Sequence, residues 1–333
     1  MAKLKDIRGT NIQSLASDPP SPVEGQLWYN TTARVLKGLK KTAAAAWASG
    51  GNMPKTRATG GGFGTQTASM FAGGLPPPSS GDNEYFLYDG SSWTSGGNIG
   101  TARYGMGASG TQTSGLIFGG YGGGFKTSTE EFDGSSWTNG GSLNTARSGI
   151  SASTGMGTQT AGLAANGYSP GLPPGYFGND VEEYNGSSWT TVTGTPGTSN
   201  YRAGCGTQTA GLIFGGANSP SSQTTTLEYD GSSWTSGGAL NTGVSHNGGG
   251  GIQTAAINFG GRTGPPNTVT NTELYDGSSW TASTALSTSR MNSGGGGTQT
   301  SSICSGGRST SAVLNNTEEF TGAAPATVSI DTD

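Results

Sequence analysis

Two short motifs recur in phase along most of this chain. The first is a Gly-Thr-Gln-Thr stretch, or a close variant, that begins at residues 64, 110, 157, 206, 251 and 297. The second is an Asp-Gly-Ser-Ser-Trp stretch, with Asn in place of Asp in the third copy, whose copies end at residues 93, 137, 189, 234 and 280. Trp47 stands one period upstream of the first copy. Successive copies of the first motif are 45 to 49 residues apart. A disordered sequence has no reason to keep such spacing, so the chain contains six copies of one structural unit.

Composition alone would suggest a different class of protein. Glycine accounts for 63 of the 333 residues, and only 11% of the residues are charged. Such values are typical of low-complexity or disordered segments. Because the two motifs keep a fixed spacing, we give the repeat precedence over the composition.

Each unit resembles a set of short strands separated by turns. In the second copy, strands are expected over residues 103–109, 115–118 and 129–132, and a fourth begins at Trp137. The Gly110–Thr113 and Asp133–Ser136 segments between them carry residues that tight reversals favour. No segment has the sustained 3.6-residue apolar period of a helix. Six four-stranded units therefore predict an all-β fold, a six-bladed β-propeller.

The few large apolar residues are placed once per unit. Leu116, Ile117 and Phe118 on the second strand are expected to be buried between blades, whereas the Gly-rich and Ser-rich first strands allow close backbone approach near the axis. No separate globular core is expected. The recurrent tryptophans should pack between neighbouring blades, and they are Trp47, Trp93, Trp137, Trp189, Trp234 and Trp280.

The order of residues within a unit resembles the kelch repeat. In the second copy, Arg103, Gly119-Gly120, Phe132-Asp133 and Trp137 follow the kelch order, and the likeness extends over about residues 47–321. The resemblance implies a propeller over residues 47–322 that mixes strands from both chain ends. Because no Trp follows Phe320, the last blade would be completed by the Trp47 strand or by the C-terminal tail, residues 323–333.

Residues 1–46 have a different character and are expected to form an extended attachment arm with a β-hairpin. The stretch Glu-Gly-Gln-Leu-Trp-Tyr-Asn over residues 24–30 resembles a hairpin found in virion proteins of tailed bacteriophages, particularly marine phages. This resemblance implies a virion protein that docks to other virion proteins through residues 1–46, in multiple copies per particle. No secretory signal is evident, so synthesis in the host cytoplasm and assembly into the phage particle, in its tail, are expected.

Residue types that carry chemistry are sparse. His246 is the single histidine, and Cys205 and Cys304 fall at different positions in different units, so a reduced, buried role is expected for both cysteines. The copper site of galactose oxidase, a kelch-type enzyme, needs two histidines that this chain lacks. Arg57, Arg103, Arg147 and Arg290, with Glu130, Glu182, Glu273 and Glu318, recur with the units and predict structural ion pairs. We expect no catalytic residues, metal or cofactor.

The charge balance argues against two further classes of partner. Sixteen basic and twenty acidic residues give a net charge of −4, and nucleic-acid binding normally requires a basic stripe. No stretch approaches the roughly 20 apolar residues of a membrane-spanning helix. We therefore expect neither nucleic-acid binding nor membrane insertion.

The connections from the second to the third strand differ between units in length and composition. Loops that vary on a constant scaffold are where repeat proteins bind partners, and all six should emerge on one face of the propeller. The aromatic and polar residues of two connections are the candidate binding residues: Tyr121, Phe125, Tyr168, Tyr176, Phe177, Asn179 and Asp180. They suit stacking on sugars or contact with a protein. The alternative is that the aromatic residues only cap the rim of the propeller.

These observations lead to one functional hypothesis and two alternatives. The hypothesis is a non-enzymatic virion structural protein, a tail-associated fibre or receptor-binding component that serves host adsorption by recognising a host-surface glycan or protein through its loops. The first alternative is a decoration or connector protein whose loops contact other virion subunits. The second is a carbohydrate-active propeller enzyme, which would need clustered acids or histidines at the axis.

Overall fold

The computed structural model describes residues 12–20, 26–41, 44–76, 81–150, 156–171, 177–218, 221–323 and 325–330. These residues form strands and turns, and no helix occurs among them. The chain divides into two compact units, Trp47–Thr321 and the combination of Met1–Ala46 with Gly322–Asp333. The larger unit contains all six sequence repeats, so the repeats fold together.

The first three repeats each form an antiparallel sheet in which sequence neighbours pair. The first sheet consists of β5 (Gly61–Thr65), β6 (Ala68–Ala72), β7 (Asp82–Tyr88) and β8 (Trp93–Arg103). The second consists of β9 (Gly107–Thr111), β10 (Ser114–Phe118), β11 (Thr129–Phe132) and β12 (Trp137–Gly140). The third contains β13 (Leu163–Gly167), β14 (Gly178–Tyr184) and β15 (Trp189–Val192). Residues 151–155, where a first strand is expected, lie outside the described residues.

The last three repeats follow the same pattern, and two of their connections carry small extra hairpins. The fourth sheet consists of β16 (Ala203–Thr207), β17 (Ala210–Phe214), β20 (Thr226–Tyr229) and β21 (Trp234–Ser236). The fifth consists of β22 (Gly248–Ile252), β23 (Ala255–Phe259), β26 (Thr272–Tyr275) and β27 (Trp280–Ser283). The hairpins are β18 (Ala217–Asn218) with β19 (Ser221–Ser222), and β24 (Arg262–Gly264) with β25 (Asn267–Thr268).

The sixth sheet joins segments from distant parts of the sequence. Its strands are β28 (Gly294–Thr298), β29 (Ser301–Ser305), β30 (Thr317–Thr321) and β4 (Ala46–Ser49). The strand that contains Trp47 therefore completes this sheet, and the Gly50 amide donates to the Thr317 carbonyl at 3.0 Å. The C-terminal tail, the other sequence-based candidate for this position, pairs elsewhere: β31 (Pro325–Ile330) lies beside β3 (Val35–Lys41).

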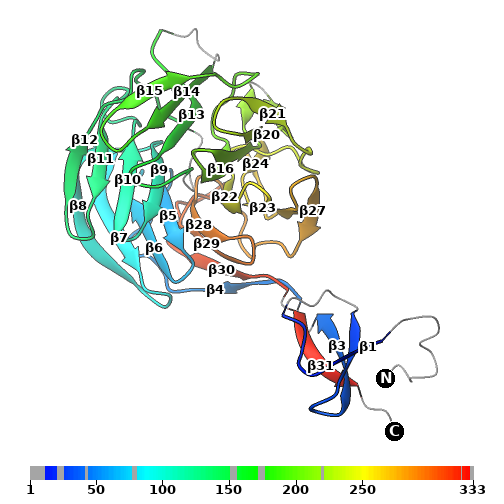
Figure 1. Ribbon diagram of the computed structural model, residues 1–333. Helices are drawn as coiled ribbons and strands as arrows, with labels where there is room; N and C mark the ends of the chain where they lie inside the picture. The colour runs from blue at the N-terminus through cyan, green and yellow to red at the C-terminus, as the bar shows by residue number, and fades with distance from the viewer. Residues whose placement is uncertain are drawn as a thin grey trace. The chain divides into compact units, whose positions relative to one another are not determined.

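Neighbouring sheets meet along their first strands and through shared side-chain clusters. β5 contacts β9 and β28, and β22 contacts β16 and β28. Figure 1 shows these first strands facing a common centre. On β10, the second strand of the second sheet, Ile117 packs with Phe63 of the first sheet. Leu116 and Phe118 of the same strand pack with Trp189 of the third sheet. Alternate side chains of one strand thus serve two interfaces, which replaces a single central core.

One predicted boundary needs correction. Residues 103–106 were expected to begin the first strand of the second repeat, but Arg103 ends β8, and β9 begins at Gly107. The reason is Gly105, whose φ of 61° lies outside the extended range and interrupts the strand between Arg103 and Gly107. Arginine occupies the position of Arg103 in three other repeats, as Arg57, Arg147 and Arg290.

The smaller unit contains one four-stranded sheet in the order β1-β2-β3-β31. β1 (Gln13–Leu15) runs parallel to β2 (Leu27–Asn30), and β2 forms the expected hairpin with β3. The segment is therefore not only an N-terminal arm, because the C-terminal β31 completes its sheet. Asp18 accepts hydrogen bonds from Trp28 Nε1 and Asn30 Nδ2 and pairs with Lys37, and these interactions lower the pKa of Asp18 to about 2.

Candidate functional site

Equivalent residues just before each first strand form a circular hydrogen-bond system, which we call the inner ring. All six have positive φ angles, from 50° to 62°. Each backbone amide donates to the carbonyl of the equivalent residue in the preceding repeat, at 2.8 to 3.0 Å, and the first repeat bonds to the sixth. The inner ring consists of Thr59, Gly105, Gly149, Tyr201, His246 and Asn292.

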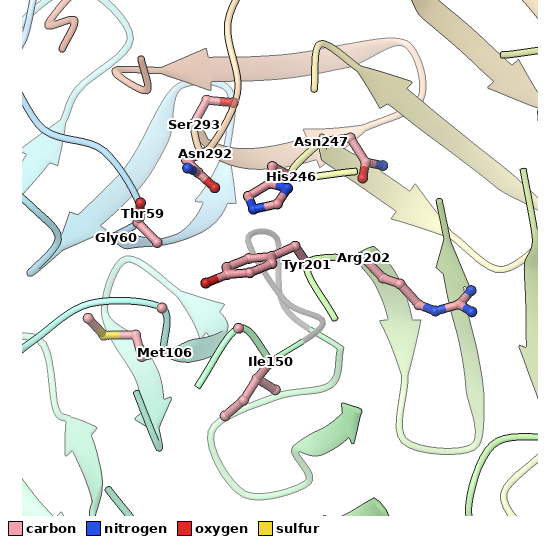
Figure 2. Close-up of a pocket in the computed structure, with 12 residues that line it drawn as sticks. Thr59, Gly60, Met106, Ile150, Tyr201, Arg202, His246, Asn247, Asn292 and Ser293 are labelled. Atoms are coloured by element: carbon pink, nitrogen blue, oxygen red, sulfur yellow. The ribbon is translucent and has the colours of Figure 1, made fainter. Parts of the chain in front are cut away.

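The inner ring surrounds a narrow pocket (Figure 2). Its lining consists of the ring residues and the residue that follows each of them, so every repeat contributes one pair. The cavity measures about 40 Å³, which is room for a few water molecules and too little for a sugar ring. The ring amides and carbonyls already bond to one another, so side chains supply the chemistry of the pocket.

Two ring side chains stack on each other in this pocket. The Tyr201 and His246 rings have centroids 3.9 Å apart and an angle of 18° between their planes. His246 Nδ1 lies 3.1 Å from the Ser245 hydroxyl. Burial, together with the charge of Arg262, lowers the pKa of His246 to about 3. His246 is therefore neutral near pH 7 and serves as a flat, polar ring surface.

Arg202 is an unusual cation beside the same pocket. It is buried, and its Nε and Nη1 atoms have no hydrogen-bond partner among the residues that the structure describes. Figure 2 shows its guanidinium pointing away from the Tyr201 and His246 rings. Burial lowers the pKa of Arg202 to about 10, which still leaves the group charged near pH 7. Arg202 thus adds positive potential on the fourth repeat's side of the pocket.

The variable connections begin next to the inner ring. In each repeat the residue before the ring residue forms a β-bridge with the first residue of the connection that follows the second strand. We call the connection residues of these bridges the outer ring; they are Leu75, Tyr121, Tyr168, Ala217, Arg262 and Arg308. The connections and the pocket therefore share one end of the sheets, which we call the connection end.

Buried arginines hold the bases of these connections. Arg103 Nη1 donates to the carbonyls of Gly119 and Ser128, which flank the second connection, and its Nη2 pairs with Glu130. Arg290 repeats the arrangement and pairs with Glu318 at 2.6 Å. The expected ion pairs are therefore present in these repeats, and Arg147 pairs with Glu182 at 3.1 Å in the third. The prediction was wrong for Glu273: Val244 stands in the arginine's place in the fifth repeat, and Glu273 accepts from the Asn241 and Thr242 amides. Because both ends of a connection are fixed, the residues between them are free to differ.

Three of the predicted binding residues come together at the connection end. Tyr121 and Phe125 have ring centroids 5.2 Å apart, and Phe125 and Tyr168 5.1 Å apart. Tyr104, which was not predicted, extends the group through a 5.6 Å contact with Tyr121. All four rings are partly exposed. We call these four residues the aromatic cluster.

The other predicted binding residues lie apart from the aromatic cluster. Asn179 and Asp180 belong to β14, and Phe177 immediately precedes that strand. Asp180 lies 3.9 Å from buried Arg147, and the Asn179 amide donates to the Thr195 carbonyl. Tyr176 falls outside the described residues.

The opposite end of the sheets, the turn end, carries interactions that the sequence interpretation missed. The glutamine of every Gly-Thr-Gln-Thr-like motif reaches the preceding sheet. There its Nε2 donates to the carbonyl at or beside the start of the second strand and to the carbonyl of the third-strand aromatic residue. The glutamines are Gln66, Gln112, Gln159, Gln208, Gln253 and Gln299. The signal that would have found this role is a glutamine at the same place in all six motifs.

The recurrent tryptophans contact the preceding sheet in several ways. Trp189 and Trp280 are 5% exposed, stack near Phe118 and Phe214, and donate through Nε1 to threonine hydroxyls of the preceding sheet. Trp93 and Trp47 make the same type of hydrogen bond. In contrast, the buried Nε1 atoms of Trp137 and Trp234 have no partner in the described part of the chain.

The Asp-Gly-Ser-Ser turns are closed by their own side chains. The Asp133 carboxylate accepts from the amides and hydroxyls of Ser135 and Ser136, and these bonds lower its pKa to about 2. Asn185 makes the corresponding interactions in the third repeat. The aspartates of this motif are therefore turn residues.

Other chemical features are limited. Cys205 and Cys304 are buried and unpaired, and burial raises the pKa of both thiols. The described ranges contain no group of three or more histidine, cysteine or acidic residues placed to hold a metal ion. They also contain no helix of the length and apolarity needed to cross a membrane. No protein-family model matches this sequence, and no curated protein matches it either.

Proposed function

We propose that this chain is a non-enzymatic structural protein of a tailed-phage virion, in which a six-bladed kelch-like propeller recognises a partner through its connection end. The observation that carries the proposal is the arrangement of that end. Six connections of different sequence begin beside one pocket, and in the second and sixth repeats a buried arginine holds the base of the connection. A constant base with a variable rim is typical of repeat proteins that bind partners.

The propeller assignment is supported by two circular patterns. The inner ring contains one residue from each repeat, and its hydrogen bonds run from each repeat to the preceding one until the first bonds to the sixth. The six glutamines follow the same order at the turn end. Two independent cycles of six favour a closed ring of six blades over an open array of sheets.

The binding role is favoured over catalysis by the character of the pocket. Its histidine is neutral and stacked on Tyr201, and no ion pair joins it to a carboxylate in the described residues. An acid–base pair normally needs titratable groups with pKa values near the working pH, within hydrogen-bonding reach of the reacting atoms. The Tyr201–His246 pair has the shape of a contact surface instead.

The smaller unit is the proposed attachment site to the virion. Among the described residues, three large hydrophobic side chains are exposed, and two of them, Ile12 and Tyr29, belong to this unit. Trp28 and Asn30 of the phage-like motif bond to Asp18, so they maintain the fold, whereas Tyr29 between them is 37% exposed. Exposed apolar side chains on a small, separately folded sheet suit a protein interface.

The attachment role is tested by removing these side chains in assembled particles. A phage that carries Ile12→Ser together with Tyr29→Ser should incorporate much less of the protein. The matched control is Ile252→Ser, which removes the third exposed hydrophobic side chain, 56% exposed, from the repeat unit. If both variants are incorporated equally well, the smaller unit is not the attachment site.

The recognition role is tested by exchanging one connection. Replacing residues 169–177 with a Gly-Ser linker keeps Tyr168 and β14 in place. We expect normal assembly and weaker adsorption to the host. Normal adsorption with poor assembly would instead favour the decoration or connector alternative, because the connections would then contact other virion subunits.

A further inference from the structure

The outer ring divides the connection end into two chemically different halves. Four of its six members define these halves: Tyr121 and Tyr168 in the second and third repeats, and Arg262 and Arg308 in the fifth and sixth. Because the repeats follow one another in a cycle of six, the second and third lie across the pocket from the fifth and sixth. An aromatic half therefore faces a cationic half.

The two arginines of the cationic half have no acidic partner. Neither Arg262 nor Arg308 forms an ion pair with a carboxylate in the part of the chain that the structure describes. Arg308 is exposed and Arg262 is partly exposed. Arginine without an internal carboxylate presents donors whose planar geometry matches carboxylate, sulfate and phosphate groups.

Two aspartates at the same end lie near buried arginines. Asp82 pairs with buried Arg57, and Asp180 lies 3.9 Å from buried Arg147. Buried Arg202, which forms no ion pair within the described ranges, adds a further positive charge beside the pocket. The chain has a net charge of −4, but the aspartates of the Asp-Gly-Ser-Ser turns lie at the turn end. The connection end is thus locally positive on an acidic protein, which favours anions there.

The aromatic half supplies a different type of contact. Tyr104, Tyr121, Phe125 and Tyr168 form a continuous group of partly exposed rings with centroid distances of 5.1 to 5.6 Å. Tyrosine combines an apolar ring with a polar hydroxyl, and this combination suits a sugar ring, which has apolar faces and a polar edge. The pocket between the halves is too small for a sugar ring, so a ligand that touches both must lie across its mouth.

We propose that the connection end binds an acidic oligosaccharide, with neutral sugar faces on the aromatic cluster and carboxylate, sulfate or phosphate substituents at Arg262 and Arg308. This inference rests on the proposed recognition role and specifies its ligand class. The stacked Tyr201 and His246 rings line the pocket that the ligand would cover. The same chemistry is offered by uronic-acid polymers and by sulfated polymers.

The test is binding of the full chain to defined polysaccharides. The probes are polygalacturonate for carboxylate, dextran sulfate for sulfate and unmodified dextran as the neutral reference. We expect measurable binding to at least one acidic polymer, no binding to dextran, and weaker binding as salt increases. The Arg262→Gln/Arg308→Gln variant should lose at least about tenfold in affinity, since each charged hydrogen bond contributes roughly a factor of ten.

Two further variants test the aromatic half and control for the loss of an arginine charge. Tyr121→Ala should lower the affinity for the acidic polymer about tenfold, because it removes a stacking surface. The salt dependence of binding should stay unchanged, because no charge is removed. Arg34→Gln makes the same chemical change as the arginine variants but in the smaller unit, and it should leave binding unchanged. Circular dichroism and thermal unfolding of each variant establish that the fold is retained.

Three outcomes would overturn the inference. They are absence of binding to both acidic polymers, equal binding to dextran, and equal or tighter binding to single-stranded DNA, which would indicate nucleic-acid recognition. If the acidic polymers do not bind but exchange of residues 169–177 still weakens host adsorption, the recognition role stands and the ligand class is wrong. If a phage that carries this exchange together with Arg262→Gln and Arg308→Gln adsorbs normally, the recognition role fails independently.

Discussion

The two ends of the sheets in the larger unit follow opposite rules. At the turn end, every repeat uses the same glutamine to reach the same two carbonyls of the preceding sheet. At the connection end, only the inner-ring backbone is alike in all six repeats, and the outer ring contains leucine, tyrosine, alanine and arginine. The turn end therefore carries uniform contacts that should stabilise the packing of neighbouring sheets. The residues that differ between repeats lie around the pocket. The difference teaches that substitutions at the two ends should affect different properties.

The largest effect should come from a tryptophan near the turn end. Trp189→Ala removes a buried ring and its hydrogen bond to Thr129, and we expect a loss of about 3–5 kcal/mol in the free energy of unfolding. Trp234→Ala should cost at least about 1 kcal/mol less, because Trp234 Nε1 has no partner and its ring is only partly buried. Urea unfolding of both variants checks the order. Equal losses would show that the hydrogen bond to the preceding sheet contributes nothing.

The next largest loss in the free energy of unfolding should come from removing a glutamine contact. Gln112→Ala leaves the Ser69 and Tyr88 carbonyls without their side-chain donor, and we expect a loss of about 2 kcal/mol. Thr113→Ala, an exposed neighbour in the same motif, is the control and should stay within about 0.5 kcal/mol of the parent. A neutral Gln112→Ala would mean that the recurrent glutamine does not stabilise contacts between sheets.

An effect of similar size, which depends on pH, is expected at the inner ring. The pKa of His246 is about 3 in the folded chain and close to 6.5 when unfolded, so between these values the unfolded chain binds the extra proton. Stability should therefore fall as pH decreases through this window, by at most about 1.4 kcal/mol per pH unit from this group. His246→Asn should remove that contribution, and Asn292 shows that asparagine fits the equivalent position. Between pH 7 and pH 5 the free energy of unfolding should fall more for the parent than for His246→Asn; an equal fall in both proteins would contradict the low pKa.

The smallest effect on stability should come from the connection end. Exchange of residues 169–177 for a Gly-Ser linker of equal length should change the free energy of unfolding by about 0.5 kcal/mol or less, because the segment lies between fixed ends and outside the strands. Thermal unfolding measures this. A loss comparable to that of Gln112→Ala would show that this connection supports the sheets and would weaken the contrast between the two ends.

The repeat arrangement could be predicted from the sequence because short local motifs mark the turns and strands of each repeat. The Gly-Thr-Gln-Thr and Asp-Gly-Ser-Ser-Trp motifs mark the two turns of each sheet, and Ile117 and Phe118 mark its buried strand. The division of the connection end into an aromatic and a cationic half could not be predicted from the sequence. Tyr104 and Tyr121 lie in contact because a β-bridge joins a residue before one strand to a residue after the next, a pairing that no local pattern encodes.

The pocket was also missed from the sequence for a physical reason. Its ring residues share a backbone conformation and not a side-chain type, since Thr59, Tyr201 and His246 are chemically unrelated. The single histidine appeared isolated in the sequence, and only the fold places it on Tyr201. The C-terminal strand was ambiguous because both β4 and β31 are short strands at the ends of the chain, and partner choice depends on long-range packing.

The pairing of β4 with β30 has a consequence for how the protein is made. Residues 50–316 separate the two strands, so β4 leaves the ribosome long before its partner exists. The entropic cost of joining such distant segments grows only slowly with their separation, but the pairing is slow because it is so non-local. An unfinished chain therefore retains an uncovered strand edge, which is prone to aggregation and accessible to chaperones and proteases. Translation must reach residue 321 before the sixth sheet is complete, so a chain that stops before β30 lacks the partner of β4.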